Sequence, residues 1–382
     1  MRFSYEQGPI RPPSEAKSLL IRVTRNCPWN KCAFCHTYRG TKFQMRKVED
    51  VKKDITTVRE IADKIRELSW KMGQGGEISE YVVNHIYHEG GSFDDSYRSV
   101  AAWLYFGGTS VFLQDANTII MKTADLIEVI SFIKEQFPTV NRITSYCRSK
   151  TACRKSVEEF KQLKDAGLSR IHIGLESGYD PVLKFIDKGV TAEEHVKGGR
   201  NIVESGISLS EYVIPGLGGE KWSMEHAEET AKVLNRINPD YIRLRSLQVR
   251  RNTELYKMRE EGEFKKLSDE DVVKEIRLCI ENLDGIQSRV VSDHILNLLE
   301  ELEGKLPEDK EKLLGIIDRY FALPEDDRII YRIGRRRGIY RRLDDLSDMR
   351  VYQTLKTIVD EYKKEGVGAL DRDLYKIMHS FI

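Results

Sequence analysis

From residue 18 to residue 250, short runs rich in aliphatic and β-branched residues alternate with longer amphipathic stretches. This alternation constrains the fold most strongly, because strands separated by helices pair in parallel through right-handed crossovers. We expect strands at residues 18–25, 110–115, 142–148, 170–177, 207–215 and 240–249. Helices are expected between the later strands at residues 124–137, 155–166, 192–205 and 224–237. The sequence therefore predicts an α/β fold, a partial (β/α)6 TIM-like barrel that is two units short of a complete one.

Two regions depart from the barrel pattern. After a helical stretch at residues 48–70, residues 71–109 form an insertion with two further helical stretches, which predicts a helical hairpin. From about residue 284 the strand pattern ends, and helices are expected at residues 292–303, 308–321 and 351–364. We therefore divide the chain into an N-terminal segment (1–17), the barrel (18–250) and a mostly helical C-terminal extension (251–382).

Composition excludes some classes of protein. The chain has 62 Lys and Arg against 61 Asp and Glu, so its global charge gives no argument for a polyanionic partner. It has no apolar signal core and no stretch approaching the roughly 18 apolar residues that a membrane helix needs. We therefore expect no membrane span and a cytoplasmic protein, whose thiols stay reduced.

Three of the six cysteines, Cys27, Cys32 and Cys35, lie within nine residues just after the first expected strand. Thiolates bind iron or zinc, and three ligands leave one iron of a cubane cluster without a protein ligand. A structural zinc site would want a fourth ligand, but His36 is adjacent to Cys35 and no second cysteine knuckle follows. Zinc and non-ligating cysteines remain alternatives, and the spacing favours a cluster.

The segment Cys27-Pro-Trp-Asn-Lys-Cys32-Ala-Phe-Cys35 resembles the signature of the radical S-adenosylmethionine (SAM) superfamily, usually Cys-x3-Cys-x2-Cys. Here four residues separate the first two cysteines, which places the chain among the variant motifs. The resemblance implies an oxygen-sensitive enzyme with a [4Fe–4S] cluster on the three cysteines and SAM on the open iron. It also implies that Phe34 packs near the adenine. A flavodoxin or ferredoxin would supply the electron that cleaves SAM to a 5′-deoxyadenosyl radical.

The resemblance also assigns SAM contacts to the carboxyl ends of the strands. The usual Gly-Gly-Glu after the second strand is replaced by a stretch that offers Asp115 and Asn117 as acceptors, although Asn117 could instead cap a helix. Arg148, after the third strand, would pair with the SAM carboxylate, or would be an ordinary surface arginine.

The fourth strand, Ile171-His-Ile-Gly-Leu-Glu176-Ser177-Gly178, resembles that of coproporphyrinogen dehydrogenase-like enzymes and tRNA methylthiotransferases. In those families the positions of Glu176 and Ser177 contact SAM oxygens. Gly216, in a glycine-rich turn after the fifth strand, would let the backbone approach the adenine closely, although such a turn is often only a turn. No residue is assigned as catalytic.

The substrate is the least constrained part of the prediction. Aromatic residues in the insertion, including Trp103, favour a small-molecule or lipid-like substrate, which is the expectation here. The arginine-rich run at 332–342 indicates RNA modification as an alternative, although acidic residues flank it and could neutralise it. A third alternative is a non-catalytic zinc or iron–sulfur binding protein.

Overall fold

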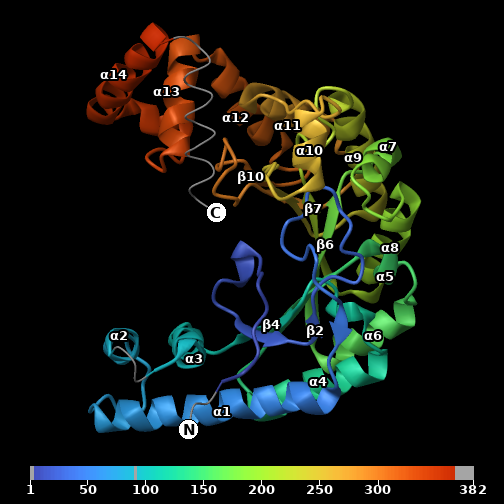
Figure 1. Ribbon diagram of the computed structural model, residues 1–382, viewed down its shortest axis with the longest axis vertical. Helices are drawn as coiled ribbons and strands as arrows, with labels where there is room; N and C mark the ends of the chain where they lie inside the picture. Colours follow the sequence, from blue (N-terminus) through green and yellow to red (C-terminus); the bar gives the residue numbers. More distant parts are fainter. Residues whose placement is uncertain (1–3, 90–92, 366–382) are drawn as a thin grey trace. The chain divides into compact units, whose positions relative to one another are not determined.

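The computed structural model describes residues 4–89 and 93–365, which form two compact units (Figure 1). The first unit comprises Met1–Gly174 and Lys184–Ser210, and the second comprises Leu175–Leu183 and Glu211–Ile382. This division falls inside the predicted barrel, whereas the sequence analysis placed a boundary at residue 250. Parts of three predicted regions, at residues 1–3, 90–92 and 366–382, lie outside the described residues.

Parallel strands form the centre of the first unit. The strands follow one another in the sheet as β1 (Leu19–Arg22), β4 (Ser110–Gln114), β5 (Arg142–Cys147) and β6 (Leu168–Glu176). Each pairs in parallel with the next, with Leu19 opposite Val111 and Ser110 opposite Arg142. Because the strands are parallel, their carboxyl ends lie at one edge of the sheet. A short antiparallel pair, β2 (Thr24–Arg25) and β3 (Gln44–Met45), follows β1.

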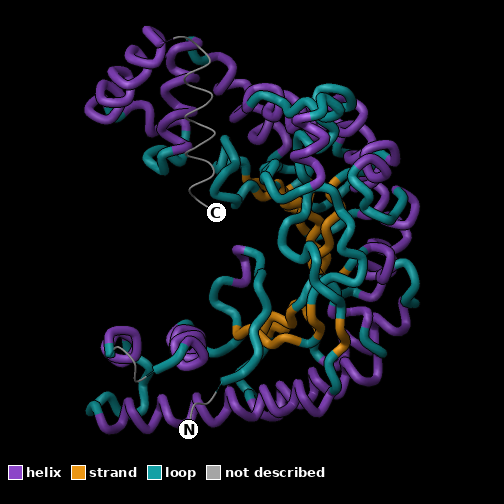
Figure 2. Tube along the Cα trace, in the orientation of Figure 1, coloured by secondary structure: helices purple, strands orange, loops and turns teal. Residues whose placement is uncertain are grey.

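Helices α1 (Val48–Lys71), α4 (Thr123–Gln136), α6 (Val157–Ala166) and α8 (Ala192–Ser205) pack in sequence, each against the next. Their apolar residues recur every three or four positions and are buried, as in α1 at Val51, Ile55 and Val58. Capping boxes begin α6 and α8, and Gly167 and Gly206 are the C-caps of these helices. Figure 2 shows these helices and the strands between them.

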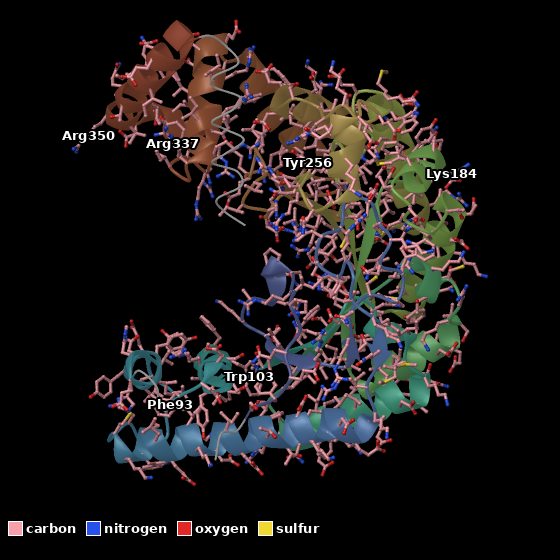
Figure 3. The ribbon with its side chains drawn as sticks, in the orientation of Figure 1. Phe93, Trp103, Lys184, Tyr256, Arg337 and Arg350 are labelled. Atoms are coloured by element: carbon pink, nitrogen blue, oxygen red, sulfur yellow. The ribbon has the colours of Figure 1, made fainter. Side chains whose placement is uncertain are left out.

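The predicted insertion contains α2 (Glu80–His88) and α3 (Asp95–Tyr105), which pack together. Trp103, labelled in Figure 3, is 3% exposed, meets Phe137 edge to face and donates from Nε1 to Ser110 O at 2.9 Å. Ser110 is the first residue of β4, so α3 lies at the amino ends of the strands. Trp103 is therefore a core residue at the edge opposite the cysteine loop. Trp103 itself therefore gives no support to a small-molecule or lipid-like substrate.

The second unit continues the sheet pattern with β7 (Ser208–Val213, which begins in the first unit), β8 (Tyr241–Leu244), β9 (Arg289–Val291) and β10 (Glu303–Lys305). β8 pairs with β9 in parallel, and β9 with β10 antiparallel. The expectation that strands end near residue 284 is therefore wrong. The helix expected at residues 292–303 is also wrong, because most of this segment is a loop. Ser292 and Asn297 bond through their side chains to each other and to the Leu299 and Leu244 carbonyls, and such local bonds compete with helix formation.

Helices make up most of the rest of the second unit. α9 (Ser223–Ile237) packs on α11 (Asp269–Asn282), α11 on α12 (Lys310–Ala322), and α13 (Glu325–Arg336) on α14 (Met349–Glu365). α12 and α14 correspond to the helices predicted at residues 308–321 and 351–364. No helix was predicted at α13, which overlaps the arginine-rich run. The short helical pieces of the two units are η1 (Pro13–Glu15), η2 (Thr118–Ile120), α5 (Ser149–Ala152), α7 (Asp180–Phe185), α10 (Glu254–Glu260) and η3 (Leu343–Ser347). Within the described residues, no helix has both the length and the apolar character that a bilayer crossing requires.

Two arginines at the centre of the arginine-rich run are structural. Arg335 and Arg336 are each 5% exposed. Arg335 donates to the carbonyls of Leu298, Asn297 and Tyr340 at 2.8–3.1 Å. Arg336 donates to Asp269 Oδ1 at 2.7 Å. Figure 3 labels Arg337, the next residue, which is exposed. The buried arginines therefore hold α13 in place and cannot reach a phosphate backbone.

We predict that Arg336→Ala lowers the free energy of unfolding by about 3–5 kcal/mol, because it leaves Asp269 without its main partner. Arg337→Ala is the matched control and should stay within about 0.5 kcal/mol of the parent, since its side chain is exposed. Urea unfolding followed by circular dichroism measures both. Equal stabilities for the two variants would contradict the structural role.

Candidate functional site

The predicted ligand loop, from Cys27 to Cys35, directly follows β2. Asn26 and Asn30 have positive φ angles of 67° and 52°, which asparagine tolerates better than most residues. The chain therefore turns before and after Cys27. The Cys35 N–H donates to Cys32 O at 3.1 Å, which forms a second turn. All three thiols are free and partly exposed.

The pKa of the Cys32 thiol is influenced by the other two cysteines, so the three thiols lie near one another. Burial raises the pKa of Cys32 to about 11, Lys188 and Arg148 lower it, and the other two cysteines raise it. Among the residues that the structure describes, no three His, Cys, Asp or Glu side chains are placed to hold a single metal ion. A cubane cluster binds each thiolate through a different iron atom, so its ligands need not converge on one point. Three free thiols on one loop fit that donor set.

A segment after α7 contacts the cysteine loop. Ala33 N–H donates to Ile186 O at 2.8 Å, and Trp29 Nε1 donates to Asp187 O at 2.6 Å. Gly189 has a φ of 69°, and a Cβ there would lie 2.4 Å from the Trp29 ring. Only glycine allows this approach. Residues 186–189, called the cover segment below, therefore fix the position of the loop between Cys27 and Cys35.

Arg148 and Phe34 both lie beside Lys188 of the cover segment. Arg148 donates from Nη2 to Lys188 O at 2.9 Å and its guanidinium lies 5.2 Å from the centre of the Trp29 ring. Lys188 Nζ lies 5.9 Å from the centre of the Phe34 ring. The structure thus brings Arg148 to the cysteine loop, of which Phe34 is itself a part. Their predicted contacts with SAM are not tested by these distances.

Asp115 is buried at the end of β4, and protein groups occupy both of its oxygens. Oδ2 accepts from Arg22 Nη2 at 2.8 Å and from Asn26 N–H at 3.1 Å, and the Tyr38 hydroxyl donates to Oδ1. The residue is 0% exposed. This geometry argues against the predicted direct contact with SAM. The carboxylate instead ties both sides of the cysteine loop to the sheet, which is a role that sequence reasoning missed.

Asn117 is also 0% exposed. Its Nδ2 donates to Thr151 Oγ1 at 2.8 Å, and its Oδ1 accepts from Arg148 N–H at 2.9 Å. It makes no side-chain cap bond to η2, which follows it, so the helix-cap alternative is not supported. Asn117 therefore connects the end of β4 to the end of β5, and it has no oxygen facing outward for SAM.

The other three predicted contacts belong to the second unit. Glu176 has a φ of 64° and is 9% exposed. Ser177 is fully buried and its Oγ lies 2.8 Å from His226 Nδ1. Gly216 has a φ of 83° and its N–H donates to Glu275 Oε1 at 2.6 Å. His226 follows Ser177 by 49 positions and Glu275 follows Gly216 by 59, and no motif in the sequence indicated either residue.

The family model of the Radical SAM superfamily matches residues 21–234, more than half of the chain. The chain belongs to the radical SAM superfamily. It is therefore an enzyme of that class, and it uses a [4Fe–4S] cluster and SAM. The matched region runs from β1 into α9 and therefore includes all three cysteines and strands β4 to β7.

Two curated relatives are tRNA uridine(34) acetyltransferases. The enzyme of Methanocaldococcus infernus is 29% identical over 122 residues, which are 32% of this chain and 23% of that protein. The enzyme of Methanocaldococcus jannaschii is 27% identical over 123 residues, 31% of this chain and 22% of that protein. The chain thus matches less than a quarter of the length of these relatives.

Solved structures are similar at low identity. Methylornithine synthase (PylB) has 14% identity and a TM-score of 0.39, with 81% of this chain and 84% of that chain covered. The cobalamin-dependent SAM radical enzyme OxsB has 12% identity and a TM-score of 0.45, with 94% and 58% covered.

We predict that Asp115→Asn raises the rate at which a chelator removes iron from the reconstituted protein. The amide cannot balance Arg22, and losing a hydrogen bond to a charged group costs about 1.5–3 kcal/mol, so a rise of roughly tenfold or more is expected. Asp165→Asn, at an exposed position of α6, is the control and should change nothing. If Asp115→Asn keeps its iron but binds SAM more weakly, the direct contact is right and the anchoring role is wrong.

Proposed function

We propose that Cys27, Cys32 and Cys35 hold the cluster of this radical SAM enzyme, and that SAM binds beside them. The observation that carries this assignment is the set of three free thiols on one loop at the carboxyl edge of the sheet. When bound, the cluster supplies the electron that cleaves SAM to methionine and a 5′-deoxyadenosyl radical, which takes a hydrogen atom from the substrate.

The protein's own groups position and neutralise this centre. Asp115 fixes the start of the loop through Asn26 and its later part through Tyr38. The cover segment fixes Trp29 and Ala33. Burial raises the pKa of Cys32, and the cationic side chains of Lys188 and Arg148 offset part of this rise in favour of the thiolate that binds iron.

Three residues remain our proposed SAM contacts. Arginine offers five N–H donors, and Arg148 uses one of them to bond Lys188 O. Its remaining guanidinium N–H groups would bind the SAM carboxylate. Phe34 would pack on the adenine, and Glu176 would bind SAM hydroxyl or amino groups. Ser177 and Gly216 are proposed to contribute through the shape of their turns, because the Ser177 side chain and the Gly216 N–H are engaged within the protein.

We predict about four irons and four sulfides per chain after anaerobic reconstitution. Cys32→Ala should lose nearly all of both, because two thiolates cannot hold a cubane. Cys279→Ala is the matched control: Cys279 lies within α11 and not on the loop that carries the three proposed ligands, so its loss should not matter. One tightly bound zinc and no iron in the parent protein would contradict the assignment.

A second proposal concerns the substrate, and we favour RNA. The argument for a small molecule or lipid rested on the aromatic residues of the insertion, and Trp103 among them is buried at the opposite edge of the sheet. The observation that favours RNA is the similarity to two tRNA uridine(34) acetyltransferases over about a third of the chain. The buried Arg335 and Arg336 do not contribute to this argument. A small-molecule substrate is the alternative.

Bulk tRNA tests the substrate class. With SAM and dithionite, adding tRNA should increase the rate of 5′-deoxyadenosine formation and leave a modified nucleoside in the digested RNA. Digestion with ribonuclease before the reaction is the control and should abolish both effects. The small-molecule alternative would be favoured if the rate of 5′-deoxyadenosine formation does not change with tRNA but rises with a metabolite extract free of protein and RNA.

The reaction also needs a reductant and a compartment where thiols stay reduced. We propose a flavodoxin or ferredoxin as the electron donor and the cytoplasm as the compartment, because free thiols and an iron–sulfur centre persist under reducing conditions.

A further inference from the structure

A strained turn ends β6 in the second unit. Ser177 N–H donates to Leu175 O at 2.8 Å, and Glu176 between them has a φ of 64°. This is a γ-turn with positive φ at its central residue, which is rare and strained for a residue with a side chain. Such strain persists only where the surrounding structure holds it, and it is concentrated at functional sites. The structure shows what holds this turn.

His226, on α9, connects this turn to the one that ends β7. The residue is 1% exposed. Its Nε2 lies 3.1 Å from Ile214 O, and its Nδ1 lies 2.8 Å from Ser177 Oγ. A carbonyl oxygen can only accept, so Nε2 carries the proton. In the neutral ring Nδ1 is then an acceptor, and the Ser177 hydroxyl donates to it. The same Oγ accepts from Tyr179 N–H at 3.1 Å, and the hydroxyl has no second proton to donate to a ligand.

Glu275, on α11, holds the second turn. It is 4% exposed, and its Oε1 accepts from Gly216 N–H at 2.6 Å. Its Oε2 accepts from the Ser223 hydroxyl at 2.6 Å, and its Oε1 lies 3.5 Å from His226 Nε2. The pKa of Glu275 is raised above its usual value, because the effect of burial exceeds the lowering by His226, Ser223 and Gly216. The network therefore joins α9, α11 and both strand ends through buried groups.

The γ-turn also packs closely on α9. Gly178 N–H donates to Thr230 Oγ1 at 2.9 Å, and a Cβ at Gly178 would lie 2.4 Å from Glu229 O. No other residue fits there without displacing backbone. The turn from Glu176 to Gly178 is thus held by the backbone and Thr230 of α9 and by His226 on the same helix.

We infer that His226 and Glu275 are positioning residues for SAM binding. They hold the turns at Glu176 and Gly216 in the shape that SAM recognises, without touching SAM themselves. This inference rests on the proposed function, because it takes Glu176 and the Gly216 turn as parts of the SAM site. It also gives the C-terminal extension a role: α11, which supplies Glu275, lies beyond residue 250.

The test measures SAM affinity through the change that SAM causes in the spectrum of the reconstituted cluster. Glu275→Ala and His226→Ala should each weaken SAM binding by roughly tenfold or more, because each leaves a buried partner without its bond. Glu275→Gln should restore most of the affinity, since its amide oxygen can still accept from Gly216. Iron content per chain should match the parent in all three variants.

Ile280→Ala, a buried apolar position further along α11, is the control for loss of stability. It should unfold at lower urea concentration and yet keep the parental SAM affinity. If Glu275→Ala and His226→Ala bind SAM like the parent, or if Ile280→Ala weakens SAM as much as they do, the positioning role is overturned. If the parent itself carries a full cluster but binds no SAM, the proposed function fails and the inference fails with it.

Discussion

The buried Asp115 carboxylate is the interaction on which the proposed centre depends most. It lies at the end of β4, next to β1, and it binds Arg22 at the end of β1 and Asn26 directly before Cys27. A buried carboxylate is stable only with partners of this kind, because an unpaired charge in the interior is costly. The same bonds therefore stabilise the sheet edge and fix the start of the cysteine loop. Catalytic geometry and folding stability are linked at this one residue.

In the second unit, different buried polar side chains also hold strand-end segments in place. There a histidine and a glutamate bind the polar groups of two strand-end turns, and helices from later in the chain supply both side chains. In each unit, the residues that resembled SAM contacts include side chains that face inward. Resemblance to a family indicates which strand ends matter, whereas burial decides which side chain at that end can meet a ligand.

The sequence predicted the features that depend on local pattern. The alternation of strands and helices follows from the periodicity of apolar residues, and the cluster assignment follows from the spacing and ligand chemistry of the cysteines. It failed where tertiary contacts override the pattern. The pattern of apolar residues near Leu298 predicted a helix, but these residues are buried in a loop. Side-chain hydrogen bonds of Ser292 and Asn297 stabilise that loop. Trp103 looked like a binding surface but is core, and Arg335 and Arg336 looked like an RNA-binding run but bind carbonyls and Asp269.

The most direct test of the central claim is the product of SAM cleavage. The reconstituted protein, reduced with dithionite under anaerobic conditions, should convert SAM slowly to 5′-deoxyadenosine and methionine in equal amounts, even without substrate. The Cys32→Ala variant, treated identically, should form neither product above the background of reagents alone. Chromatography with mass detection quantifies both products. A parent protein that holds its full complement of iron and yet forms no 5′-deoxyadenosine, or a variant that forms as much as the parent, would contradict the account.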